Sequence, residues 1–287
     1  MRFTAWLVLF ATLLLWSGNW IVARAAREEI GPALATVGRL FLVLAILVPF
    51  TARALIEKLP ELERRDWAIL AALGLTGGGP HLALQWLGLH YTTATSGILY
   101  LSVTPVFILL LAAPLGERIR LAQWAGVVIS FSGVALIATH GNVSLVSFNI
   151  GDLMAIVSMM MWAGYTVLLR VRRDRLDIAE LLTMVCGFGF ACMLPWLAWE
   201  ITAYEMRLTA RGAAAVLYSG IGSLLLAYAG WSYVVTRLGA ARAGATLHLM
   251  PAMGVALSAL FLGELPSAYH FAGIGLILTG TWVASTR

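Results

Sequence analysis

Residues 67–116 read WAILAALGLTGGGPHLALQWLGLHYTTATSGILYLSVTPVFILLLAAPLG, a stretch that holds no Asp, Glu, Lys or Arg. One membrane-spanning helix needs about 20 predominantly apolar residues, so this stretch predicts two spans joined by a short turn. Apolar runs elsewhere are also unbroken, as from Phe41 to Phe50. Strands of a membrane barrel alternate apolar and polar residues, so the pattern favours helices, which pair their own backbone groups in lipid.

The composition of the whole chain agrees with this interpretation. Of its 287 residues, 61% are hydrophobic and 11% are charged, with a mean hydropathy of +0.88. A soluble protein carries roughly 25% charged residues, so much of this surface must face lipid. The sequence predicts an all-α integral membrane protein with ten transmembrane helices. The predicted spans are Phe3–Ala25, Ala33–Ile56, Asp66–Leu89, Thr92–Leu115, Leu121–Thr139, Ile150–Leu169, Ile178–Trp199, Arg211–Val235, Ala241–Leu262 and Ala268–Ser285.

The basic residues indicate which side of the membrane holds the termini. Ten spans place both termini and the even-numbered loops on one side. Of the 19 Lys and Arg residues, all lie on that side except Arg39, inside the second span, and Arg24, Arg27, Arg207 and Arg211. The positive-inside bias therefore predicts cytoplasmic termini, and it explains the net charge of +5 without a nucleic-acid partner.

An internal repeat divides the chain into two halves. Trp16-Ser17-Gly18 recurs as Trp162-Ala163-Gly164, and the same interval separates Arg24 from Arg170, Gly74 from Gly220 and Pro105 from Pro251. After one inserted residue, Leu115-Gly116-Glu117 recurs as Leu262-Gly263-Glu264. We expect five-helix repeats over residues 1–140 and 150–287. Because five is odd, the second repeat is inverted, an arrangement frequent in secondary transporters.

The start of the chain has a second interpretation. Arg2, the apolar run and Ala23-Arg24-Ala25 also fit a signal peptide, whose removal would leave nine spans. The repeat favours ten, because the first span has a partner in the second half.

The segment from Leu15 to Arg24, LWSGNWIVAR, followed by Gly31-Pro32 and Gly38-Arg39-Leu40-Phe41, resembles the first two helices of the drug/metabolite transporter superfamily. The branch that it resembles has ten helices in two EamA-type repeats, and the Leu-Gly-Glu ends of the fourth and ninth spans are similar too. The resemblance implies a bacterial inner-membrane exporter of amino acids or other small metabolites. Within the family, the sequence is most similar to bacterial exporters of amino acids, including aromatic ones.

Several residues are candidates for breaks in the spans. Pro105 and Pro251 lie mid-span at matched positions. A proline removes a backbone donor, and such breaks in transporters point to a central site. Gly77-Gly78-Gly79-Pro80 interrupts the third span, so Gly79 and Pro80 are candidate hinge residues. Packing kinks are the alternative for all of them.

Polar and aromatic side chains at membrane depth are the candidates for substrate binding. Polar groups are costly in lipid, so they face the interior of the bundle or a cavity. Each could instead tie helices together, and a lone aromatic residue is more often packing. The candidates are Asn19, His81, Gln85, Tyr100, Tyr228, Trp231 and His248.

Arg39 is the charged residue that lies well inside a span. It could reach outward to the interface, pair with a helix C-terminus or meet a substrate carboxylate, and the resemblance favours a structural or gating role. Asp and Glu are absent from the middle of the spans, so facilitated diffusion is simpler than ion coupling. We read Cys186 and Cys192 as small buried residues that form no disulfide and no metal site.

These observations favour a transporter over the other classes. The His-Glu-x-x-His pattern of a metalloprotease is absent, so we expect no enzyme, metal or cofactor. The leading hypothesis is export of amino acids, aromatic ones or a broad range, by alternating access about a central cavity. Export of other metabolites or drugs and a channel-like facilitator remain alternatives. The expected partners are a small-molecule substrate and the lipid bilayer, with the protein a monomer or weak homodimer. Glycines at heptad spacing in the fifth and tenth spans could serve such a dimer or pack within one chain.

Overall fold

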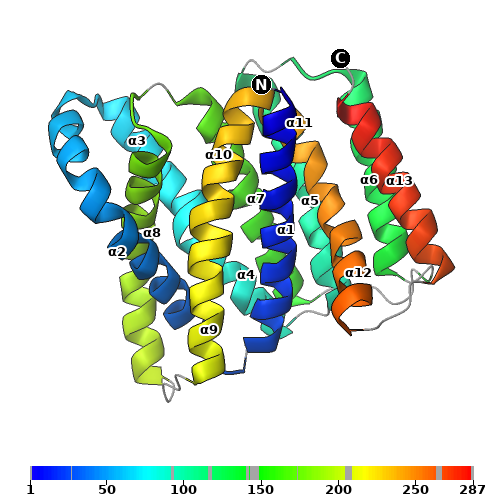
Figure 1. Cartoon of the computed structure of the whole chain (residues 1–287), viewed down its shortest axis with the longest axis horizontal. Coiled ribbons are helices and arrows are strands. Elements are labelled where there is room, and N and C mark those ends of the chain that lie inside the picture. Colours follow the sequence, from blue (N-terminus) through cyan, green and yellow to red (C-terminus); the bar gives the residue numbers. More distant parts are fainter. Residues whose placement is uncertain are drawn as a thin grey trace.

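The computed structural model of the protein is all-helical in the residues that it describes (Figure 1). These are residues 2–26, 28–91, 94–115, 118–139, 142, 149–172, 174–203, 209–262 and 267–285. Each of the ten predicted spans is occupied by helix, which confirms the predicted fold class. Six helices are long and apolar enough to cross a membrane, and shorter apolar helices cover Val103–Leu115, Leu121–Ile137 and Ala268–Ala284.

The first half contains five spans, the third of which is interrupted. Its helices end in short 3-10 turns after the second and fourth spans, at Leu59–Glu61 and Ala113–Leu115. The elements are α1 (Arg2–Ala26), α2 (Pro32–Lys58), α3 (Arg64–Leu73), the π-helical turn η2 (Gly74–Gly78), α4 (Pro80–Tyr91), α5 (Ala94–Ala112) and α6 (Leu121–Ala138).

The second half repeats this order, with interruptions in its third and fourth spans. The elements are α7 (Ile150–Val171), α8 (Ile178–Ala203), α9 (Ala210–Tyr218), the π-helical turn η5 (Ser219–Leu226), α10 (Ala227–Leu238), α11 (Ala240–Ala245), the 3-10 turn η6 (Thr246–His248), α12 (Leu249–Leu262) and α13 (Ala268–Ser285).

Local sequence explains where these helices begin and end. The Asn149 side chain accepts hydrogen bonds from the backbone of Gly151 and Asp152, and so caps α7. Thr209 caps α9 in the same way, and Pro32 occupies the first turn of α2, where no donor is needed. Gly239, with φ 88°, ends α10 in a conformation that favours glycine.

The two halves interlock in pairs that a twofold axis in the membrane plane would produce. α1 packs on α10 as α4 packs on α7, and α5 packs on α7 as α12 packs on α1. The second span of each half packs on its counterpart, α2 on α8, and so does the fifth, α6 on α13. The core therefore forms between the halves rather than within each one.

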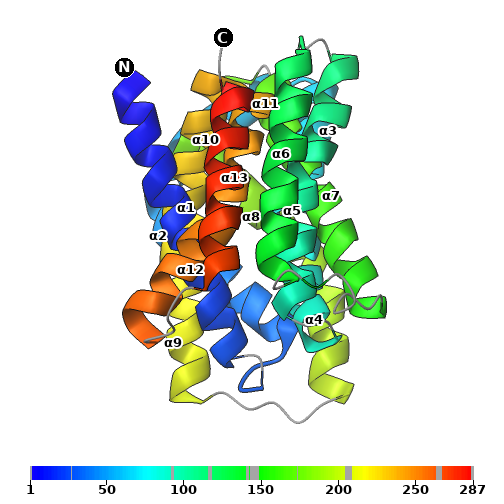
Figure 2. The same cartoon turned by 90° about the vertical axis from the view of Figure 1, so that its right-hand side faces the viewer.

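α6 and α13 lie side by side with their backbones in direct contact (Figure 2). A Cβ atom at Gly126 would lie 2.5 Å from the carbonyl oxygen of Gly280, and one at Gly133 would lie 2.5 Å from that of Gly273. The glycines at heptad spacing thus pack within one chain, which allows the helices to approach closely.

α2 and α8 are held together at both ends and in between. At one end the Glu200 carboxylate accepts hydrogen bonds from Ala33 N at 2.9 Å and Leu34 N at 3.0 Å. At the other end Lys58 pairs with the buried Glu180 at 2.7 Å. The hydroxyls of Thr51 and Thr183 lie 3.0 Å apart between them. These contacts hold α2 of the first half against α8 of the second half.

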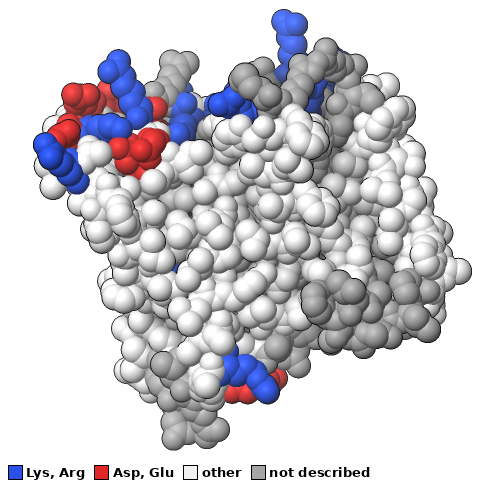
Figure 3. Space-filling view, viewed as in Figure 1, with Lys and Arg blue, Asp and Glu red and all other residues white. Residues whose placement is uncertain are grey.

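The surface matches a protein surrounded by lipid. A broad band without charged residues separates the two charged ends, and most of the visible Lys and Arg lie at the end that holds both termini (Figures 1 and 3). Large apolar side chains are exposed in the spans, among them Phe41, Phe271 and Trp282. Cys186 is buried as expected, but the expectation was wrong for Cys192, which is exposed on α8.

Candidate functional site

A cavity of about 50 Å³ lies at the centre of the bundle. Its walls come from the first, third, sixth, eighth and ninth spans, and so from both halves. The lining residues are Trp16, Asn19, His81, Leu82, Gln85, Met159, Trp162, Ser223, Tyr228, Leu247 and Met250.

Two of the walls come from equivalent positions of the repeats. Trp16 on α1 and Trp162 on α7 are repeat partners, and their ring centroids lie 5.1 Å apart with the planes at 90°. This perpendicular arrangement is a preferred aromatic contact. The twofold axis that relates the halves thus passes through the cavity.

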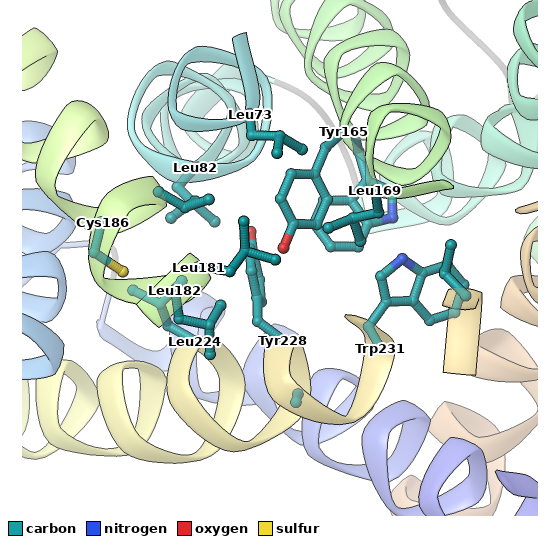
Figure 4. Close-up of a cluster of buried hydrophobic side chains, with 14 of the residues drawn as sticks. Leu73, Leu82, Tyr165, Leu169, Leu181, Leu182, Cys186, Leu224, Tyr228 and Trp231 are labelled. Atoms are coloured by element: carbon teal, nitrogen blue, oxygen red, sulfur yellow. The ribbon is translucent and has the colours of Figure 1, made fainter. Parts of the chain in front are cut away.

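Further aromatic rings join this pair. Tyr228 lies 5.0 Å from Trp162 and 5.4 Å from Tyr165, measured between ring centroids. Trp231 lies 5.3 Å from Trp16, and its indole nitrogen donates to the Thr166 hydroxyl at 3.1 Å. Tyr165 and Tyr228 point toward each other across the bundle interior, with Trp231 beside them (Figure 4). We call Trp16, Trp162, Tyr165, Tyr228 and Trp231 the aromatic cluster.

The two π-helical turns supply backbone acceptors to this cluster. A π-helical turn is one residue wider than an α-helical turn, as the bonds from Gly79 N to Gly74 O and from Ala227 N to Gly222 O show. The Tyr228 hydroxyl donates to the carbonyl of Gly77 at 2.7 Å. The Trp16 indole donates to the carbonyl of Ser223 at 3.0 Å.

Gly77 and Ser223 are themselves repeat partners. Each half thus offers a carbonyl of its wide turn to an aromatic side chain that lines the cavity. The donor in each bond belongs to the opposite half, because Tyr228 bonds η2 and Trp16 bonds η5. The walls of the cavity are therefore coupled to the interruptions of the third and eighth spans.

His81 is held in a fixed orientation. Its Nδ1 lies 2.8 Å from both the carbonyl and the hydroxyl oxygen of Ser158, and its ring stacks on Trp162 at 5.3 Å. The Ser158 hydroxyl donates to the His81 carbonyl at 2.9 Å. Because a carbonyl only accepts, we assign the proton of the neutral ring to Nδ1. Nε2 is then an acceptor.

Two neutral amides also line the cavity. Asn19 Oδ1 accepts a hydrogen bond from Ser219 at 2.7 Å. Gln85 is half-buried and forms no hydrogen bond within the described residues. Its amide can therefore both donate to and accept from a bound molecule.

The structure brings together most of the predicted binding residues. Asn19, His81, Gln85 and Tyr228 line the cavity. Trp231 lies behind them in the aromatic cluster, and His248 is fully buried in η6, next to the lining residue Leu247. The side chain of Tyr100 lies outside the described residues.

The predicted hinge residues lie at different kinds of position. Gly79 ends η2 and Pro80 begins α4, so both lie at the interruption of the third span. Pro251 follows the 3-10 turn η6, whereas α5 continues as an α-helix through Pro105. The ninth span is thus interrupted and its counterpart is not.

Sequence reasoning did not assign Trp16, Met159, Trp162, Ser223 and Met250 to the site. A signal was present for the two tryptophans, because they begin the most recognisable repeated motif. Methionine, serine and leucine are common in spans, so these residue types alone do not indicate a binding site. Among the described residues, no group of His, Cys, Asp and Glu is placed to hold a metal ion.

The sequence matches one transporter family twice. The model of the EamA-like transporter family matches residues 3–139 and again residues 149–286. The chain belongs to the EamA-like transporter family. It is therefore a multi-pass membrane transporter built from two copies of the EamA unit, not an enzyme, and the resemblance seen in the sequence is confirmed.

Curated relatives cover nearly the whole of this EamA-like transporter. A transporter of Archaeoglobus fulgidus is 29% identical over 98% of this chain and 97% of its own length. A probable terminal-alkyne amino-acid exporter of Streptantibioticus cattleyicolor is 26% identical over 97% of this chain and 92% of its own. The transporter YetK of Bacillus subtilis is 25% identical over 97% of this chain and 86% of its own.

The fold of this EamA-like transporter also occurs among solved structures. One crystal structure superposes with a TM-score of 0.78 and covers 99% of this chain and 97% of its own, at 22% sequence identity. At that identity the likeness concerns the fold alone.

Proposed function

We propose that the protein exports amino acids or similar small metabolites by alternating access about the central cavity. The observation that carries this proposal is the cavity itself, because equivalent positions of two inverted repeats form its walls. Repeats 1–140 and 150–287 that exchange conformations would open such a site to one side and then to the other. The similarity to a probable amino-acid exporter supports the substrate class.

The chemistry of the walls suits a small molecule with an apolar side chain. Aromatic faces offer area for stacking, and the amides of Asn19 and Gln85 with His81 Nε2 offer both donors and acceptors. The lining residues include no carboxylate, the group that proton-coupled carriers often use. We therefore propose facilitated diffusion, with both termini in the cytoplasm of a bacterial cell.

The proposal is tested by uptake of radiolabelled phenylalanine and leucine into liposomes that contain the purified protein, with no ion gradient. We expect saturable uptake that is accelerated when the liposomes are preloaded with unlabelled substrate. Gln85→Leu removes an amide that can bind a substrate, and Trp16→Phe removes the indole donor that holds the carbonyl of Ser223 at the cavity wall, so each should reduce uptake several-fold.

A matched control uses a tryptophan that lies outside the site. Trp282 on α13 is 69% exposed, so Trp282→Phe should leave uptake unchanged. Uptake that appears only with a proton or sodium gradient would contradict facilitated diffusion. Absence of uptake for all amino acids, with or without a gradient, would contradict amino-acid transport and favour other metabolites or drugs.

A further inference from the structure

Arg39 is a cation buried at membrane depth. It lies on α2, about two turns inside the N-terminus of that helix, and its side chain is only 1% exposed. A charged side chain in this position is costly unless an opposite charge or strong hydrogen bonds compensate it. The contacts of its guanidinium therefore show which compensating groups the fold supplies.

The partners of the guanidinium among the described residues are neutral. Nη2 donates to the Thr36 hydroxyl at 3.2 Å and to the carbonyl of Leu82 at 3.3 Å, and the group lies 5.7 Å from the centre of the Trp86 ring. Nε has no acceptor. Within the described part of the chain, no carboxylate pairs with Arg39. Among the residues that the structure describes, the positive charge therefore has no counter-ion.

This charge lies directly behind one wall of the cavity. The side chain of Leu82, whose carbonyl accepts from Arg39, lines the cavity, as do His81 and Gln85 on the same turns of α4. On the other side, a Cβ atom at Gly220 of η5 would lie 3.5 Å from the Arg39 Cα. Arg39 thus lies between the two interrupted spans, behind the wall that Leu82 forms.

The aromatic walls of the cavity have the reverse preference. The faces of Trp16, Trp162 and Tyr228 attract cations through their ring quadrupoles, but the lining residues provide no negative charge to balance one. In a low-dielectric interior, the field of Arg39 repels a lone cation and attracts an anion. A molecule with an ammonium and a carboxylate satisfies both preferences at once.

We propose that Arg39 sets the charge selectivity of the cavity, so that a transported molecule must carry a carboxylate and organic cations without one are rejected. The inference rests on the proposed function and names the substrate class of the same site. The ammonium group lies over the aromatic faces, and the carboxylate lies on the α4 side, where it balances Arg39.

The test compares three molecules with the same phenyl ring. L-Phenylalanine carries both charges, 3-phenylpropionate carries only the carboxylate, and phenethylamine carries only the ammonium group. Their dissociation constants are measured on the purified protein by the change in tryptophan fluorescence. We expect phenylalanine and 3-phenylpropionate to bind at least tenfold more tightly than phenethylamine.

Variants of Arg39 and a matched arginine assign the preference to one side chain. Arg39→Gln should weaken 3-phenylpropionate binding at least tenfold and leave phenethylamine binding unchanged or stronger, whereas Arg39→Lys should retain the preference for the carboxylate. Arg53 lies on the same helix with its side chain 95% exposed, so Arg53→Gln should bind all three molecules like the unaltered protein. Should Arg39→Gln not fold, the comparison of ligands on the unaltered protein decides.

Two results would overturn the proposal in different ways. If phenethylamine binds the unaltered protein as tightly as phenylalanine, charge selectivity is absent while amino-acid transport still stands. If none of the three molecules binds and liposomes take up no amino acid, both the proposed function and this inference fall.

Discussion

The hydroxyl of Tyr228 links the cavity wall to the wide turn η2, and its removal tests that link. It donates to the Gly77 carbonyl at 2.7 Å, and the residue is only 2% exposed. Tyr228→Phe keeps the ring but leaves this carbonyl unsatisfied, so we expect a loss of about 1–3 kcal/mol in the free energy of unfolding. The measurement is thermal unfolding in detergent.

The control for this change is a tyrosine on the surface. Tyr91 is 57% exposed, so Tyr91→Phe should leave the unfolding temperature unchanged. Equal unfolding temperatures for Tyr228→Phe and the unaltered protein would show that the bond to the wide turn contributes nothing.

Glu200 provides a second prediction about one side chain. Its carboxylate is 3% exposed and accepts the first free backbone donors of α2. Glu200→Gln loses the charge and one acceptor at a helix N-terminus, so stability should fall by about 1 kcal/mol. Glu57→Gln changes an exposed pair with Arg53 and should have little effect. The two variants are compared by unfolding temperature in detergent, and an equal response would argue against a role for Glu200 in holding α2.

Sequence reasoning predicted the polar residues that line the cavity better than the apolar ones. Asn19, His81 and Gln85 were predicted because polar groups at membrane depth need a reason to be there. Met159 and Met250 are apolar, like the residues that only pack helices together. Their place in the cavity wall is therefore visible in the structure but not in the sequence. The unpaired state of Arg39 was also hidden, since a counter-ion on another helix is invisible in a single sequence.

At the scale of elements, the contact between η2 and α8 depends on glycines from both sides. A Cβ atom at Gly189 would lie 2.7 Å from Gly79 N and 2.9 Å from Gly78 Cα. Gly189→Ala must push these backbones apart, so we expect stability to fall by about 1–3 kcal/mol. We also expect slower transport, because the interrupted third span would be displaced.

The same helix offers the matched control. A Cβ atom at Gly187 would meet nothing within 4 Å, and alanine is the better helix former by roughly 1 kcal/mol. Gly187→Ala should therefore be neutral or slightly stabilising. Thermal unfolding and liposome uptake of the two alanine variants compare them directly, and similar behaviour would refute the close approach of η2 to α8.

The interruptions of the spans were predictable only in part. Gly77-Gly78-Gly79-Pro80 marked the third span clearly, because glycine and proline weaken a helix. The eighth span has no proline at η5, and the sequence predicted no interruption there. Pro105 is the reverse case. A proline is a strong sign of an interruption, yet α5 stays helical through it. Packing on neighbouring helices decides these cases.

At the scale of the whole molecule, the arrangement of charge makes a prediction about orientation. Both termini lie at the end where most of the visible basic residues gather (Figures 1 and 3). From the positive-inside bias we expect that end to face the cytoplasm. A green fluorescent protein fused to the C-terminus should fluoresce in bacterial cells, whereas alkaline phosphatase fused there should be inactive. The reverse pattern would require the opposite orientation.

The architecture of the whole chain was the most predictable level. Ten spans followed from lengths of apolar sequence, and the inverted relation of the halves followed from an odd number of spans in each repeat. Both signals are sums over many residues, so no single ambiguous position can change them. Which spans pair across the halves was not predictable, because helix faces in lipid show little contrast between buried and exposed sides.

The glycine contact between α6 and α13 has a consequence for how the protein is made. The ribosome synthesises α6 near the middle of the chain, but its partner is the last span to emerge. Until α13 is synthesised, the glycine face of α6 lacks the helix against which it packs. Closure of the bundle is therefore a late step in biogenesis, and a chain that stops before Ala268 leaves its first half unfinished as well as its second.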